Sequence, residues 1–200
     1  LSDVDLVIDR TVKAGALSVK LIGSGGGMTP HTFPERPNFS QDIFDHVAGR
    51  ARAMGLPSVV HVLPAESIKM GALARFDSLE HCAFFSRDKT GELVRNFDPN
   101  IANIVAASGS AMMANLSTAM KPPKNHRRSR FDKGPKNKQL ELMLHNFEAM
   151  HKAGIPMVCG TDAGVRDTPF SMTWAELAWM EQAGMAAREA IGTATRNAAR

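Results

Sequence analysis

Two patterns of hydrophobic positions alternate along the chain. Stretches with apolar residues at helical spacing end at a glycine or proline, and a short apolar run with a polar residue near its end follows. These runs predict strands over residues 17–22, 58–63, 76–82, 110–116 and 156–162. Strands that alternate with helices are typical of parallel β/α proteins, and continuously apolar strands indicate a sheet covered on both faces.

The helical pattern predicts one helix before each strand and two more after the last strand. The predicted helices span residues 4–14, 40–54, 65–75, 99–107, 140–150, 174–182 and 187–199. We therefore expect an α/β fold with five parallel strands. This number fits either a doubly wound sheet or the second half of an eight-stranded barrel.

Four titratable residues occupy strand positions where an apolar residue would be expected. They are Lys20, His61, His81 and Asp162. Chemistry in parallel β/α folds is found at the carboxyl ends of the strands. Lys20 lies between apolar neighbours, so we expect its ammonium to be buried and to need a counter-ion, a lowered pKa or a covalent modification. The alternative is a lysine whose tip reaches solvent or a local carboxylate.

The two strand histidines are 20 residues apart, the length of one strand-helix-strand step. Consecutive strands would bring the imidazoles of His61 and His81 to the same rim, with Asp162 on a later strand. Imidazole and carboxylate together favour a metal such as Zn²⁺. The alternatives are two histidines satisfied within the core and an aspartate that caps a plain turn.

The glycine-rich segment 23–27 follows the first strand. Its spacing is neither the dinucleotide fingerprint nor a phosphate loop, because no Lys-Ser or Lys-Thr pair follows. A backbone that closely approaches a ligand beside Lys20 is the favoured interpretation.

Composition places few limits on function. The chain has 200 residues, of which 44% are hydrophobic, enough for a core. Its net charge of +4 comes from one segment, since eight basic residues and only Asp132 lie between Lys121 and Lys138, which leaves 16 basic and 19 acidic residues elsewhere. We interpret residues 120–138 as a solvated basic loop. The alternative is a contact surface for an anionic substrate or a nucleic acid, but Phe131 is the only aromatic residue available there for stacking.

The sequence predicts no membrane span, since its longest apolar window, 101–116, is interrupted by polar residues. Cys82 and Cys159 lie in apolar runs and indicate buried thiols, which favours a reducing compartment such as the cytoplasm. We expect a small-molecule substrate and no nucleic-acid partner, and homo-oligomer formation stays open.

The order of the motifs resembles the amidohydrolase superfamily, in its imidazolonepropionase-like and Xaa-Pro dipeptidase-like branch. The segments that resemble strands four, five, six and eight are Val19-Lys20-Leu21-Ile22 with Ser24-Gly25-Gly26-Gly27, Val60-His61-Val62, Asp77-Ser78-Leu79-Glu80-His81, and Gly160-Thr161-Asp162-Ala163-Gly164. Residues 176–185 and 190–200 resemble the helices after strand eight. The resemblance covers most of the chain except the basic loop.

This resemblance implies a partial (β/α)₈ TIM barrel, strands four to eight with the C-terminal helices, as one catalytic-domain fragment over residues 1–200. It also implies one or two divalent metal ions, with Zn favoured over Mn, Co or Fe. Lys20 would bridge two metals as a carbamate, and His61 and His81 would bind the second metal. Asp162 would bind the first metal and act as general base. The implied reaction is hydrolysis of an amide or cyclic C–N bond by metal-activated hydroxide.

One family motif is missing, because no His-x-His pair occurs in the chain. We expect it on strand one, upstream of Leu1, and we expect the 200 residues alone to be inactive. Two other functions stay open from the sequence. One is a barrel lyase with Lys20 as Schiff-base nucleophile. The other is a non-catalytic α/β domain that binds anions or nucleic acid through residues 121–138.

Overall fold

The computed structural model describes residues 1–118, 138–165 and 168–199 of the chain. Apart from Lys138, the predicted basic loop over 120–138 lies outside the described residues. In chain order the elements are α1 (Ser2–Lys13), β1 (Val19–Ile22), α2 (Gln41–Ala53), β2 (Ser58–Pro64), α3 (Ala65–Ala74), β3 (Ser78–Arg87), β4 (Leu93–Arg95), α4 (Pro99–Ser108), β5 (Ala111–Met113), the 3₁₀ turn η1 (Leu116–Thr118), α5 (Lys138–Lys152), α6 (Thr173–Gln182) and α7 (Ala187–Thr193).

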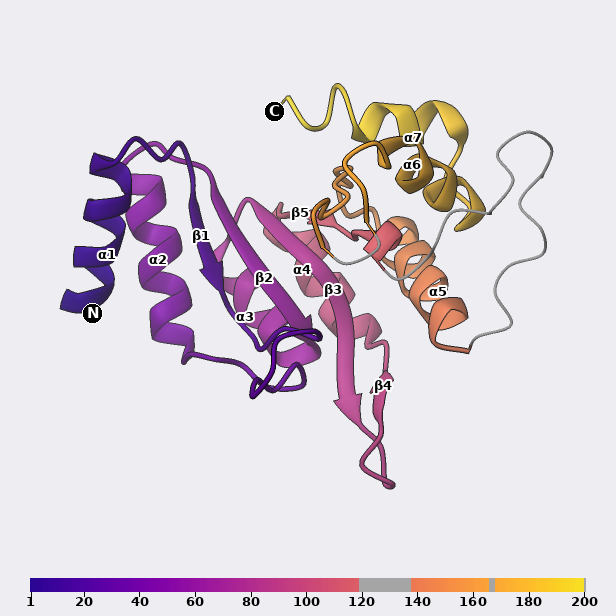
Figure 1. Ribbon diagram of the computed structural model, residues 1–200, viewed down its shortest axis with the longest axis horizontal. Helices are drawn as coiled ribbons and strands as arrows, with labels where there is room; N and C mark the ends of the chain where they lie inside the picture. Colours follow the sequence, from indigo (N-terminus) through magenta and orange to yellow (C-terminus); the bar gives the residue numbers. More distant parts are fainter. Residues whose placement is uncertain (119–137, 166–167, 200) are drawn as a thin grey trace.

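The sheet is parallel except for one short strand. β1 pairs with β2, β2 with β3, and the first residues of β3 with β5, all in parallel, so their carboxyl ends point the same way. β4 pairs antiparallel with the last residues of β3 and forms a hairpin that projects beyond the sheet (Figure 1). The parallel strands confirm the predicted β/α architecture, whereas the hairpin was not predicted.

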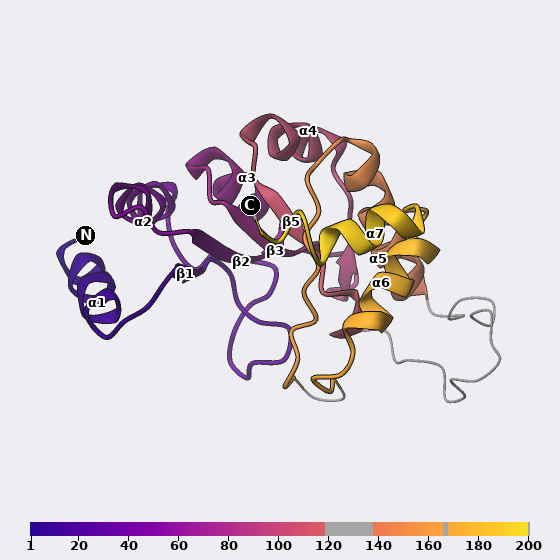
Figure 2. The ribbon, with the colours of Figure 1, turned by 90° about the horizontal axis from the view of Figure 1, so that it is seen from above.

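Helices cover one face of this sheet. Figure 2 shows α2, α3 and α4 along one side of β1, β2 and β3. The side chains of Val60, Val62 and Leu79 on that face are fully buried. α3 packs so closely that a Cβ on Gly71 would lie 2.9 Å from Leu79 Cδ2 and 3.1 Å from Val60 Cγ1. A larger residue there would push the helix away from the strands.

The described residues leave the opposite face of the sheet exposed at β1. β1 alternates, with Val19 and Leu21 buried and Lys20 and Ile22 exposed, so the expectation of two covered faces is wrong for this strand. Further along the same face, a cavity of about 800 Å³ is lined partly by Val59, Ser78, Glu80, Ala111, Met113 and Val158.

Two predicted strands are shorter than expected. Residues 110–116 contain the three-residue β5, which stops before Asn115, a residue with a left-handed backbone (φ 53°). Residues 156–162 form only one parallel bridge, between Met157 and Met112 of β5. Hydrogen bonds from Met112 N to Pro156 O (2.8 Å) and from Val158 N to Met112 O (2.9 Å) hold this segment beside the sheet. The predicted direction is therefore confirmed, but the predicted length is wrong.

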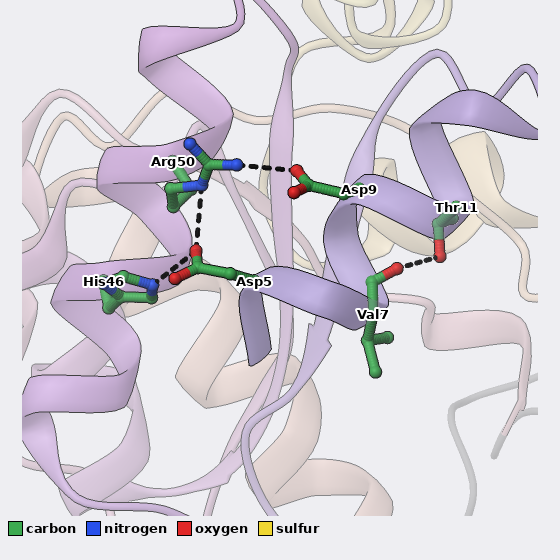
Figure 3. A network of polar contacts seen from close by, with 6 residues as sticks. All are labelled: Asp5, Val7, Asp9, Thr11, His46 and Arg50. Atoms are coloured by element: carbon green, nitrogen blue, oxygen red, sulfur yellow. Dashed lines mark hydrogen bonds and ion pairs between the residues drawn. The ribbon is translucent and has the colours of Figure 1, made fainter. Parts of the chain in front are cut away.

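Charged side chains connect α1 to α2 (Figure 3). Arg50 Nη2 of α2 donates to Asp9 (2.6 Å), Arg50 Nε forms an ion pair with Asp5 (3.0 Å), and His46 Nε2 lies 2.8 Å from Asp5 Oδ1. Partly exposed ion pairs each contribute about 1 kcal/mol or less. The buried side chain of Ile8 therefore supplies the apolar anchor of this helix. No helix among the described residues is long and apolar enough to cross a membrane.

A buried carboxylate attaches α6 to the turn after β5. Glu176 is fully buried and accepts hydrogen bonds from Leu116 N (2.8 Å), Ser117 N (2.7 Å) and Ser117 Oγ (2.6 Å). Burial raises the pKa of Glu176, and the hydrogen bonds oppose that rise. This contact fixes the C-terminal helices against the sheet.

We expect Glu176→Ala to lower the free energy of unfolding by about 3 kcal/mol, because it leaves two buried backbone N–H groups unpaired. Glu181→Ala, on the exposed side of the same helix, is the matched control and should change stability by no more than about 0.5 kcal/mol. Chemical denaturation measures both values. Equal stability of the two variants would contradict the role of Glu176 in holding α6 against the turn after β5.

Candidate functional site

Two histidine rings meet on neighbouring strands. His61 of β2 and His81 of β3 have ring centroids 4.7 Å apart, with an edge-to-face angle of 72°. The register pairs Ile22 with His61 and His61 with Glu80, so these three residues share the open face of the sheet. The structure thus confirms the predicted proximity of the two imidazoles.

His81 reaches this position through an irregularity in β3. Its register partner is Val62, which is buried under the helices, so regular alternation would turn His81 to that covered face. Instead the backbone is left-handed at His81 (φ 69°), Cys82 (φ 43°) and Phe84 (φ 54°), and the pairing with β2 shifts after Val62. Such a bulge redirects a side chain. β3 continues to Arg87, so the expectation that His81 stands at a strand end is wrong.

The glycine-rich segment after β1 contacts His61 directly. The imidazole Nε2 of His61 donates to Gly25 O at 3.4 Å. A carbonyl can only accept, so Nε2 carries the hydrogen and Nδ1 keeps its lone pair. A Cβ on Gly25 would lie 2.5 Å from backbone atoms of Phe33, so only glycine fits there. The glycines therefore allow the loop to fold tightly beside the histidine.

Lys20 lies on the same face as the histidines but is exposed. Within the described part of the chain, β1 is an edge strand that pairs only with β2. The expectation of a buried ammonium is therefore wrong, and the alternative with a tip in solvent describes this residue. Its charge still acts on the site, because it lowers the pKa of both histidines and of Glu80.

The charge of Asp162 also acts on the site. Its side chain is exposed, its backbone is left-handed (φ 53°), and its negative charge raises the pKa of His61 and Glu80. The segment that carries it follows the bridge beside β5. Asp162 thus lies close enough to act on groups from β2 and β3, as predicted for residues at one rim.

Burial keeps both imidazoles neutral. It is the largest cause that lowers the pKa of His61, and it lowers the pKa of His81 to about 3, with the charges of His61, Lys20 and Arg95 adding to the effect. Neutral imidazole is the form that binds metal ions. No group of three or more His, Cys, Asp or Glu residues in the described ranges has the geometry of a metal site. The described site therefore offers two neutral imidazoles with Lys20 and Asp162 nearby.

Sequence reasoning missed Glu80 and Arg95. Glu80 is 6% exposed and faces the cavity, where Ser78 Oγ donates to its carboxyl oxygen (3.0 Å) and burial raises its pKa. A glutamate within an apolar run could have indicated this buried carboxyl group. Arg95 lies on β4, and no local pattern pointed to that strand.

We expect NMR of chelator-treated protein to show that the His81 ring stays neutral down to about pH 4, because its pKa is about 3. A histidine in a model peptide titrates near 6.5. Since the unfolded chain takes up this proton first, the contribution of His81 to stability is complete above pH 6.5 and declines as the pH falls toward 3. The NMR signal of the His81 ring is the one that is missing from the spectrum of His81→Gln. A titration midpoint near 6.5 would contradict the buried geometry.

Comparison with known proteins gives a family and a fold. The sequence model of the amidohydrolase family matches residues 4–200, whereas a search of curated protein sequences gave no match. Among solved structures, a Xaa-Pro dipeptidase with bound methionine is similar with a TM-score of 0.78 and 24% identity, over 99% of this chain and 46% of that one. An ochratoxinase from A. niger (TM-score 0.76, 22% identity, 98% and 42% covered) and phenylurea hydrolase B (0.73, 20%, 100% and 46%) are also similar.

The chain therefore spans less than half the length of these structures. Its parallel strands and flanking helices superpose on one part of their chains, and the predicted partial barrel is confirmed at the level of the fold.

Proposed function

Because the chain belongs to the amidohydrolase family, we propose that it supplies one part of a metal-dependent hydrolase barrel that cleaves amide or cyclic C–N bonds. Membership supports a hydrolase over the barrel lyase and the non-catalytic binding domain. What we propose beyond family membership is the metal ion, the mechanism and the activity of the whole protein.

The observation that carries this proposal is the neutral histidine pair. The ring centroids of His61 and His81 lie 4.7 Å apart, and burial keeps both imidazoles in the neutral form that binds metal. The hydrogen bond to Gly25 orients His61 with Nδ1 free, as a carbonyl partner does for many metal-bound histidines. This donor set fits a divalent ion of the Zn²⁺ type.

Lys20 and Asp162 complete the proposed site. The exposed amine of Lys20 can react with carbon dioxide once it has lost its proton, and the carbamate formed would be an anionic ligand beside the histidines. Asp162 is an exposed carboxylate whose charge reaches His61. It would accept the proton of the attacking water and return it to the leaving nitrogen. A bound metal would lower the pKa of that water and polarise the scissile carbonyl.

We expect His61→Ala and His81→Ala, made in the complete protein, each to reduce the bound metal and to lower kcat/KM by about 100-fold or more. His151→Ala is the matched control, since this histidine lies on α5 and pairs with Glu189 at 2.8 Å. Elemental analysis and turnover of an N-acyl amino acid measure the two effects. Full metal content and activity in His81→Ala would contradict the proposal, as would activity that survives chelation.

A further inference from the structure

Ser24 is a fully buried serine in the glycine-rich segment that follows β1. Its hydroxyl oxygen accepts a hydrogen bond from Leu63 N of β2 at 3.0 Å. The register pairs Ile22 with His61, so two further steps along both strands place Ser24 opposite Leu63. Since β1 ends at Ile22, the hydroxyl replaces the backbone acceptor that a longer strand would offer to β2.

The same hydroxyl contacts the carbonyl that orients His61. Ser24 Oγ donates to Gly25 O at 3.3 Å, and the imidazole Nε2 of His61 donates to the same oxygen at 3.4 Å. A serine hydroxyl can donate one hydrogen bond while it accepts another, and a carbonyl oxygen can accept two. One buried side chain therefore connects the backbone of β2, two residues beyond His61, to the oxygen that holds the His61 ring.

Packing within the loop also limits the position of this carbonyl. A Cβ on Gly25 would lie 2.5 Å from backbone atoms of Phe33, so the returning part of the loop lies directly against it. Ser24 forms an antiparallel bridge with Pro37, farther along the same loop. The position of Gly25 O is therefore set by the contacts of Ser24 and Phe33 as well as by His61.

Ser67 offers a comparison within the same surroundings. It is a second fully buried serine, it lies on α3, and its Oγ donates to Gly23 O at 3.4 Å. This bond holds the glycine-rich segment at a different carbonyl, two residues before Gly25. The two serines thus share their burial and the segment they bind, but they differ in the carbonyl that each one holds.

The carbonyl of Gly25 decides which ring nitrogen of His61 is available. Neutral imidazole carries its hydrogen on one nitrogen, and the other nitrogen can bind a metal ion. The bond to Gly25 O keeps the hydrogen on Nε2 and leaves the lone pair on Nδ1. Partners of this kind also fix the orientation of the ring, and their loss typically costs about 10- to 100-fold in metal affinity.

We propose that Ser24 is a positioning residue, which holds Gly25 O against His61 and thereby keeps Nδ1 of that ring ready for a metal ion. This inference rests on the proposed function, because the metal belongs to it, but the hydrogen bonds that it assigns form without the metal. Ser24 acts only through the carbonyl of Gly25 and the ring of His61.

NMR of the complete protein, with isotope-labelled histidines and after treatment with a chelator, tests this role before any metal is added. At about pH 8, above the ordinary histidine pKa of about 6.5, the nitrogen shifts of the neutral ring report the ratio of its two tautomers. We expect Ser24→Ala to lower the ratio of the Nε2–H to the Nδ1–H form of His61 about fivefold, the effect of one hydrogen bond. The His61 signals are those missing from the spectrum of His61→Gln.

Two further variants separate positioning from stability. Ser67→Ala, the matched control, removes a buried hydroxyl from the same segment and should leave the tautomer ratio of His61 unchanged. Ser24→Thr keeps the hydroxyl and should keep the ratio of the parent protein. If Ser24→Ala does not fold, Ser24→Cys takes its place, because a thiol is a weak donor and acceptor, and it should shift the ratio in the same direction.

Zinc binding supplies the second measurement. Competition between the chelator-treated protein and a metal-binding dye measures the Kd for Zn²⁺. We expect this Kd to be about 10-fold higher in Ser24→Ala than in the parent protein, because the His61 ring loses its orientation as well as its preferred tautomer. Ser67→Ala should bind Zn²⁺ as tightly as the parent protein does.

Several results would overturn the role of Ser24. They are a hydrogen on Nδ1 of His61 in the parent protein, an unchanged tautomer ratio in Ser24→Ala, or equal changes in Ser24→Ala and Ser67→Ala. A tautomer ratio that depends on Ser24, in a protein that binds no Zn²⁺ at His61 and His81, would contradict the proposed metal site and leave the effect of Ser24 on the ring supported. Equally tight zinc binding by the parent protein and Ser24→Ala would contradict the role of Ser24 alone.

Discussion

The parallel register of β1, β2 and β3 decides which side chains meet on the open face of the sheet. It aligns Ile22 with His61 and His61 with Glu80, so groups from three separate stretches of sequence face the same side of one sheet. The helices on the covered face hold this register, and at Gly71 their backbone comes as close to the strands as a residue without a Cβ permits. Ordinary strand pairing therefore places Ile22, His61 and Glu80 on one face, and His81 joins them through the bulge in β3.

One departure from regular pairing gives the site its chemistry. Left-handed backbone at non-glycine residues costs roughly 1–2 kcal/mol each, and β3 contains three such residues within four positions. The cost is offset by burial, since Cys82 is 1% exposed and Phe84 is fully buried. The same bulge turns His81 toward His61 and lets β3 continue into the hairpin that carries Arg95. The meeting of the two imidazoles and the projecting β3–β4 hairpin thus share one structural cause.

The sequence predicted most helices and the direction of the strands, because hydrophobic periodicity and helix ends are local properties. The 20-residue spacing was enough to predict that His61 and His81 would meet. The burial of Lys20 could not be predicted, because it depends on which strands flank β1. The orientation of His81 depends on a bulge in β3, and the position of Arg95 depends on the pairing of β3 with β4. Both are properties of packing between distant segments.

Anomalous X-ray diffraction at the zinc edge, on crystals of the complete protein loaded with Zn²⁺, shows whether the two imidazoles bind metal. We expect an anomalous peak about 2.0–2.1 Å from Nδ1 of His61 and from one ring nitrogen of His81. The peak should disappear in crystals of His81→Ala grown and loaded in the same way. Zinc bound elsewhere in the protein, with both imidazoles free of metal, would contradict a metal site at His61 and His81.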